Sequence, residues 1–220
     1  VVMGNLKFDL RLPESLLAQG KRWRNTWLRP VVAIASTRDG EEVAFVRTVA
    51  AARSLPDNPL FLLIPRHPQR FDDVAAILAA AGAPYVRRSA LAADARVPQQ
   101  VRWVLGDTVG EMPAYYAASD VAIIGGSFAD FGGQNLIEAC AAGAPVIVGP
   151  YTRNFAQATE DALAAGAALR VPHATAAIIA AQQLIEDEAH RGRMAQAAGR
   201  FVAAHRGATQ RAMAALAPWL

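Results

Sequence analysis

Residues 121–150 of this chain read VAIIGGSFADFGGQNLIEACAAGAPVIVGP. The β-branched runs at both ends and the short helical run between them predict strand, glycine-rich loop, helix and strand. Glycine lets backbone approach a ligand closely, and the N–H groups at a helix N-terminus attract anions. Glu138 lies one turn into the expected helix, where its carboxylate can accept hydrogen bonds from sugar hydroxyls. We interpret the stretch as a nucleotide-sugar site rather than a site for free phosphate alone.

Helix capping is an alternative explanation of some of these residues. Asn135 and Glu138 have the spacing of a capping box, in which both side chains serve only backbone N–H groups. Gly143 followed by Pro145 is typical of the end of a helix. Taken singly, these residues are better explained by capping. The glycines ahead of the helix are more than a turn needs, and as a group they favour a ligand.

Short apolar runs alternate with alanine-rich helical runs along the rest of the chain. Strands are predicted at 31–35, 60–64, 85–87, 101–105, 121–124 and 146–148, with an edge strand at 167–170. Helices are predicted at 40–53, 71–81 and 111–118, from 135, and beyond 170. Apolar strands separated by helices indicate a parallel sheet covered on both faces. The predicted fold is therefore α/β, a doubly wound, Rossmann-like parallel sheet.

The chain is expected to divide into three segments. Residues 1–30 contain Trp23 and Trp27 but precede the first strand, and we expect a linker from a preceding N-terminal domain. Residues 31–205 form the nucleotide-sugar (donor) binding domain. Residues 206–220 form a C-terminal helix.

Composition excludes several classes of protein. Of the 220 residues, 53% are hydrophobic, which is enough for a full core. The net charge is +3 and the 22 basic residues are scattered, so no nucleic-acid partner is expected. The sequence contains no apolar run of membrane-spanning length and no signal-peptide pattern, so we expect a soluble fragment. The single cysteine, Cys140, is expected to be a small buried residue.

Unusual residues follow four of the predicted strands. Ligands of doubly wound sheets bind outside the carboxyl ends of the strands, so these loops are expected to meet at one rim. They contain Ser36 and Thr37, Arg66 and His67, residues 106–112, and Gly126-Ser127.

Each loop offers groups that suit an anionic nucleotide. Ser36 and Thr37 can donate hydrogen bonds to a ligand or to their own turn. Arg66 lies in a loop stiffened by prolines and is our candidate for a phosphate or carboxylate contact, whereas Arg70 is expected on the surface. His67 is expected to bond backbone, with proton donation as the alternative. Because no second His or Cys stands at ligand spacing, no metal is expected.

The loop at 106–112 is expected to hold a nucleobase. Its backbone at Gly110 can bond a base edge, with Met112 against the ring, and Glu111 suits the start of the next helix. The chain lacks the GxxxxGK[ST] phosphate motif and the dinucleotide GxGxxG motif.

The acidic residues after the first strand are predicted to cap a helix. Asp39 as N-cap and Glu42 three positions later have the capping-box pattern, and Glu41 also suits the first turn.

The glycine series, Glu138 and the Gly-x-Pro that follows resemble the donor-binding half of two-domain glycosyltransferases of the GT-B type. Five further pieces resemble the bacterial 3-deoxy-D-manno-octulosonic acid (Kdo) transferases. They are GNLKFD at 4–9, STRDGEE at 36–42, RHPQRF at 66–71, GDTVGEM at 106–112 and GPYTRNF at 149–155, in the expected order across nearly the whole chain.

The resemblance implies transfer of Kdo from CMP-Kdo to a lipid A precursor at the cytoplasmic face of the bacterial inner membrane, without a cofactor or metal. It implies that this chain is the C-terminal donor-binding domain, inactive alone, whose N-terminal partner domain holds the acceptor, the membrane surface and the catalytic base. The implied donor-binding residues are Ser36, Thr37, Arg66, His67, Gly110, Glu111, Met112, Gly126, Ser127, Gly132, Gly133, Gln134, Asn135 and Glu138.

Two other functions remain open from the sequence. One is a domain of a UDP-sugar transferase or epimerase, which would prefer uridine to cytidine. The other is a nucleotide-binding module without catalytic activity, which fits the absence of a clear general base in the sequence.

Overall fold

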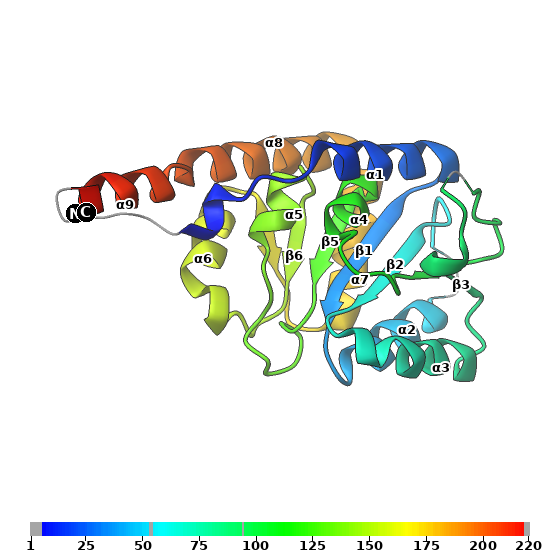
Figure 1. Ribbon diagram of the computed structural model, residues 1–220. Helices are drawn as coiled ribbons and strands as arrows, with labels where there is room; N and C mark the ends of the chain where they lie inside the picture. The colour runs from blue at the N-terminus through cyan, green and yellow to red at the C-terminus, as the bar shows by residue number, and fades with distance from the viewer. Residues whose placement is uncertain (1–5, 53–54, 94, 218–220) are drawn as a thin grey trace.

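The computed structural model describes residues 6–52, 55–93 and 95–217. They form one seven-stranded sheet in the order β3-β4-β2-β1-β5-β6-β7, in which every neighbouring pair is parallel (Figure 1). The strands are β1 (Val31–Thr37), β2 (Leu60–Pro65), β3 (Tyr85–Arg87), β4 (Trp103–Leu105), β5 (Val121–Ile124), β6 (Val146–Val148) and β7 (Ala168–Arg170). The doubly wound fold is confirmed, with β7 at an edge as predicted.

Helices cover both faces of the sheet (Figure 1). One layer holds α1, α4, α5, α6 and α8, and the other holds α2, α3 and α7. Their bounds are α1 (Glu14–Trp27), α2 (Glu41–Ala51), α3 (Phe71–Ala80), α4 (Met112–Ala118), α5 (Ile137–Ala141), α6 (Ala156–Ala164), α7 (Ala174–Glu186), α8 (Glu188–His205) and α9 (Ala208–Leu216).

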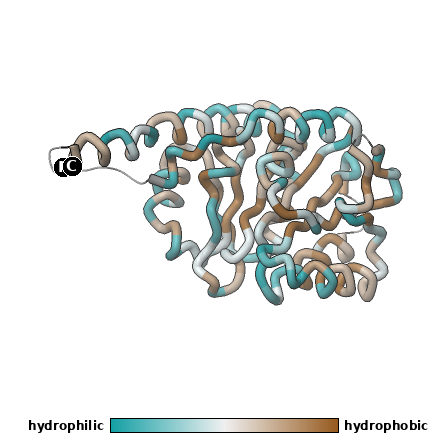
Figure 2. The backbone as a smooth tube through the Cα atoms, viewed as in Figure 1, coloured by the Kyte–Doolittle hydropathy of each residue, from teal (hydrophilic) through white to brown (hydrophobic). Residues whose placement is uncertain are grey.

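The central strand β1 shows why its sequence is apolar without alternation. Val31, Ala33 and Ala35 pack into the core under α1 and α4, whereas Val32 and Ile34 pack into the core on the opposite face. Successive side chains of a strand point to opposite faces, and here both faces are buried. The strands accordingly form the most hydrophobic part of the chain in Figure 2.

Helix α1 corrects the prediction of a linker over residues 1–30. Trp23 and Trp27 are each only 3% exposed, and their rings stack with centroids 5.7 Å apart. Gly20 lies so close to α4 that an added Cβ would be 2.2 Å from the carbonyl oxygen of Ala114. The polar residues of α1 obscured an apolar stripe at helical spacing. This helix therefore belongs to the folded domain, while residues 1–5 lie outside the described part.

Part of the segment predicted as a C-terminal helix, residues 206–220, forms α9. Gly207, with a φ of 92°, separates α8 from α9, and Figure 1 shows α9 projecting from the side of the domain. The predicted end, Pro218-Trp219-Leu220, lies outside the described residues. Within the described residues, no helix is both long and apolar enough to cross a bilayer.

Candidate functional site

A cavity of about 400 Å³ lies at the carboxyl ends of the central strands. The end of β1 and the loops that follow β2, β4 and β5 all contribute to its wall, so the predicted meeting of these segments at one rim is confirmed. Its lining consists of Ser36, Ile64, Pro65, Arg66, Pro68, Phe71, Thr108, Val109, Gly110, Met112, Tyr116, Gln134, Asn135, Glu138 and Phe155.

Half of the predicted donor-binding residues line this cavity. They are Ser36, Arg66, Gly110, Met112, Gln134, Asn135 and Glu138. The residues placed outside its lining are Thr37, His67, Glu111, Gly126, Ser127, Gly132 and Gly133.

Glu138 presents a carboxylate to the cavity. Burial raises the pKa of Glu138, and none of the described residues bonds or pairs with its carboxylate. Asn135 precedes Leu136, the N-cap of α5, and its Oδ1 accepts from the N–H of Ile137 at 3.0 Å. Asn135 therefore bonds backbone at the start of α5, but the capping box of the alternative explanation is absent. A half-buried acid without a protein partner is suited to accept hydrogen bonds from ligand hydroxyls.

Arg66 brings positive charge to the mouth of the cavity. Its side chain is exposed, and its Nε donates to Oε1 of Gln134 at 3.3 Å, linking the loop after β2 to the loop after β5. His67 beside it lies outside the cavity lining. Desolvation lowers the pKa of His67, and the charges of Arg38, Arg66 and Arg70 lower it further. The neutral imidazole is therefore favoured.

Glu41 binds backbone N–H groups of two loops, a role that the sequence pattern did not predict. The expected capping box is absent, because the N-cap of α2 is Gly40 and no side chain caps that end. Instead, the carboxylate of Glu41, on a residue only 2% exposed, accepts from the N–H groups of Arg38 at 2.9 Å, Gly126 at 2.7 Å and Phe128 at 2.9 Å. Burial raises the pKa of Glu41, and these hydrogen bonds oppose the rise.

Glu42 joins the loops after β1 and β2. Its Oε1 accepts from Thr37 Oγ1 at 2.7 Å and from Arg70 Nη1 at 2.6 Å, and Arg70 also pairs with Asp39. Thr37 is fully buried, so it serves its own turn rather than a ligand. Arg70 is held in a bridge and is not the simple surface residue predicted. The two adjacent acids thus fix three of the loops around the cavity.

Packing within the protein requires glycine at two positions of the glycine-rich loop, and the prediction that these glycines indicate a ligand stays a prediction. A Cβ on Gly125 would lie 2.7 Å from Cα of Thr37. Gly132 has a φ of +83°, and a Cβ there would lie 2.6 Å from Nδ2 of Asn154. Ser127 is fully buried, donates to the carbonyl of Ile124 at 2.5 Å and accepts from the N–H of Gly149 at 2.8 Å. These residues shape the loop without facing the cavity.

Glu111 anchors the loop before α4 through three side-chain hydrogen bonds. Glu111 accepts from Gln19 at 2.8 Å, Arg88 at 3.1 Å and Thr108 at 2.5 Å. Its carboxylate is therefore engaged within the protein and does not line the cavity, contrary to the prediction. Arg88 in turn lies over the ring of Trp23 at 4.4 Å. This network leaves Gly110 and Met112 on the cavity wall.

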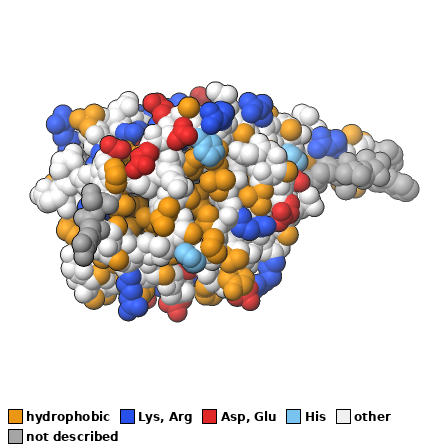
Figure 3. Space-filling view, turned by 180° about the vertical axis from the view of Figure 1, so that it is seen from behind, with side chains coloured by type: hydrophobic (Ala, Val, Ile, Leu, Met, Phe, Trp, Pro, Cys, Tyr) orange, Lys and Arg blue, Asp and Glu red, His pale blue; other side chains and the backbone are white. Residues whose placement is uncertain are grey.

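The charge elsewhere is dispersed. On the face seen in Figure 3, Lys and Arg side chains are scattered and form no continuous stripe.

Cys140 is fully buried, and burial raises its pKa to about 12, so the prediction of a small buried residue is confirmed. The expected absence of a metal stays a prediction.

Comparisons with known proteins agree with this architecture. The chain is 56% identical over its whole length to a 3-deoxy-D-manno-octulosonic acid transferase of Bordetella pertussis and 33% identical to one of Haemophilus influenzae. It spans 51% of the length of each, about half. The C-terminal CMP-Kdo binding domain of WaaA from Acinetobacter baumannii superposes with a TM-score of 0.79 at 25% identity, covering 86% of this chain and 99% of that one. The family model "Glycosyl transferases group 1" matches residues 30–201, and the chain therefore belongs to that family.

Proposed function

We propose that this chain is the donor-binding domain of a Kdo transferase and holds CMP-Kdo in the cavity described above. The observation that carries the proposal is that Arg66 after β2, Gly110 and Met112 after β4, and Glu138 in α5 all line one cavity. The 56% identical relative is named a Kdo transferase, and the structural match is named a CMP-Kdo binding domain.

The cavity offers a complementary group for each part of CMP-Kdo. The exposed guanidinium of Arg66 suits the phosphate or the sugar carboxylate, because it presents forked, charged donors. Glu138 suits the ribose hydroxyls, since its carboxylate has no protein partner among the described residues. Met112 offers an apolar wall for the cytosine ring, and the backbone at Gly110 offers hydrogen bonds for its edge.

We propose further that the whole protein transfers Kdo to a lipid A precursor at the cytoplasmic face of the bacterial inner membrane. About half of the relatives' length is not represented in this chain. We assign acceptor binding, the membrane surface and the catalytic base to that other half. In this scheme CMP-Kdo is a substrate and no cofactor takes part.

Calorimetric titration with CMP and UMP tests the proposal. CMP should bind about ten-fold tighter than UMP, as expected for one hydrogen bond lost at the base edge. Tighter binding of UMP or UDP would move the function to a UDP-sugar enzyme of the same fold. If CMP binds but combining the chain with the N-terminal half of the Bordetella relative gives no CMP-Kdo-dependent transfer, the chain is a binding module.

A further inference from the structure

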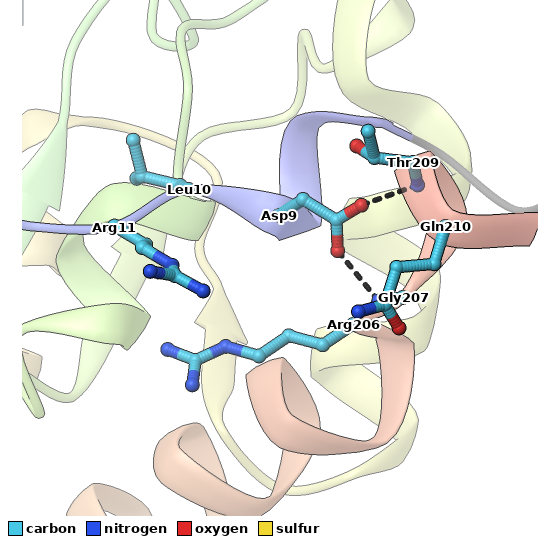
Figure 4. A pocket seen from close by; sticks show the side chains of 7 residues that line it. All are labelled: Asp9, Leu10, Arg11, Arg206, Gly207, Thr209 and Gln210. Atoms are coloured by element: carbon cyan, nitrogen blue, oxygen red, sulfur yellow. Dashed lines mark hydrogen bonds between the residues drawn. The ribbon is translucent and has the colours of Figure 1, made fainter. Parts of the chain in front are cut away.

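A second cavity, of about 410 Å³, lies where the segment after the short 3-10 turn η1 (Leu6–Asp9) meets the start of α9 (Figure 4). It shares no lining residue with the proposed donor cavity. Its walls come from the two ends of the chain, at residues 9–11 and 206–210. The donor-binding proposal gives this cavity no role.

Asp9 fixes the two walls to each other. Its carboxylate accepts from the backbone N–H groups of Gly207 and Thr209, as the dashed lines in Figure 4 show. The side chain of Thr209, followed by these N–H groups, lowers the pKa of Asp9 to about 2. The carboxylate is thus engaged in joining the walls, and its charge is offset by backbone donors at the start of the helix.

Arg11 and Arg206 line the same cavity and are both exposed. In Figure 4 their guanidinium ends extend to the same part of it, away from the bonded oxygens of Asp9. Neither side chain has a hydrogen-bond or ion-pair partner among the residues that the structure describes, and only the backbone oxygen of Arg206 accepts from Arg211. Two guanidinium groups that lie in one cavity with no carboxylate between them favour binding of an anion.

We propose that this cavity binds a phosphate monoester between Arg11 and Arg206. Two forked guanidinium groups match the several acceptor oxygens and double charge of such a group better than a single carboxylate does. The polar side chains of Thr209 and Gln210 lie on the same wall and offer further donors. The phosphate can belong to a soluble molecule or to a lipid headgroup, since both present the same chemistry.

Titration of the 220-residue chain with inorganic phosphate at constant ionic strength tests the proposal, with amide NMR shifts as the readout. The amides of Gly207, Thr209 and Gln210 should shift in a saturable manner. The double variant Arg11→Gln, Arg206→Gln should bind phosphate at least ten-fold more weakly. Arg22→Gln is the control, because Arg22 is an exposed arginine of α1 outside both cavities.

Sedimentation with vesicles distinguishes the two sources of phosphate. Binding to phosphatidylcholine vesicles that contain phosphatidic acid, lost in the double variant and absent with phosphatidylcholine alone, would identify a lipid headgroup. Phosphate-induced shifts without vesicle binding would identify a soluble phosphate. Absence of both responses, or equal responses in the double variant and the parent chain, would overturn the proposal. Arg66→Gln should leave these responses unchanged, which separates this site from the donor cavity.

Discussion

The carboxylate of Glu41 accepts a 2.7 Å hydrogen bond from the backbone N–H of Gly126, a residue 85 positions further along the chain. This bond ties the start of α2 to the glycine-rich loop after β5. The same carboxylate holds Arg38 and Phe128, so one buried side chain sets the relative positions of two loops beside the cavity.

Replacing Glu41 by Gln should therefore destabilise the fold. An amide nitrogen cannot accept a hydrogen bond, and buried N–H groups left without an acceptor cost about 1–3 kcal/mol each. We expect a loss of about 2–4 kcal/mol in the free energy of unfolding, measured by urea denaturation. Glu188→Gln, at a side chain that is 91% exposed, should change it by less than about 0.5 kcal/mol. Equal effects of the two substitutions would show that Glu41 is not the anchor described.

Gly20→Ala tests the contact between α1 and α4. In an open helical position this substitution stabilises by about 0.5–1 kcal/mol. At Gly20 the new Cβ would lie 2.2 Å from the carbonyl oxygen of Ala114, so we expect destabilisation by about 2–4 kcal/mol. Gly192→Ala, where nothing lies within 4 Å in α8, is the matched control and should stabilise. A stabilising Gly20→Ala would mean that α1 does not pack on the domain.

The amides of Gly207 and Thr209 should report the ionisation of Asp9. The pKa of Asp9 is lowered from 3.8 to about 2. A lowered acid pKa stabilises the folded contact above the ordinary value, and this contribution is lost as pH falls from about 4 to about 2. NMR shifts of both amides should titrate with a midpoint near 2, and Asp9→Asn should abolish the titration. A midpoint near 4 would indicate that Asp9 is not bound to the start of α9.

Glu138→Gln should stabilise the folded chain at neutral pH. Burial raises the pKa of Glu138 above its ordinary 4.5, so the ionised carboxylate disfavours the folded state at higher pH. The variant lacks this charge. The extra stability of the variant in urea denaturation should be full above the raised pKa of Glu138. It should vanish as the pH falls below 4.5, because the Glu138 carboxyl of the parent chain is then protonated in both the folded and the unfolded state. A variant less stable than the parent at neutral pH would point to an undetected structural partner.

The same substitution should weaken binding of CMP. Loss of charge-assisted hydrogen bonds to the ribose is expected to cost about 1–3 kcal/mol of binding free energy, measured by calorimetry. Opposite signs for stability and affinity are typical of a residue kept for a ligand. Unchanged affinity would remove Glu138 from the proposed site.

The sequence predicted the sheet well because its strands are buried on both faces. Runs such as 31–35 and 60–64 leave a clear apolar signal, and their parallel order places the following loops at one rim. Arg66 was predicted from its loop at this rim and Glu138 from its position one turn into the following helix, and both line the cavity.

The remaining features depend on partners that are distant in the sequence. Asp39, Glu41 and Glu42 have the pattern of a helix cap, and nothing nearby reveals that Gly126 and Arg70 are the partners of the two glutamates. The glycine-rich loop resembles a ligand loop for a similar reason, because the atoms that exclude a Cβ belong to other segments. The helix α1 was missed because its apolar stripe is narrow and interrupted by charged residues.

Amide NMR shifts on addition of CMP test the central claim most directly, since they locate the nucleotide on the chain. We predict saturable shifts at Gly110 and Met112 and at 134–138, around the donor cavity, and we expect Glu138→Gln to weaken the response at these positions. Shifts confined to residues outside the cavity, or no saturable shift at all, would contradict the assignment of this cavity to the nucleotide donor.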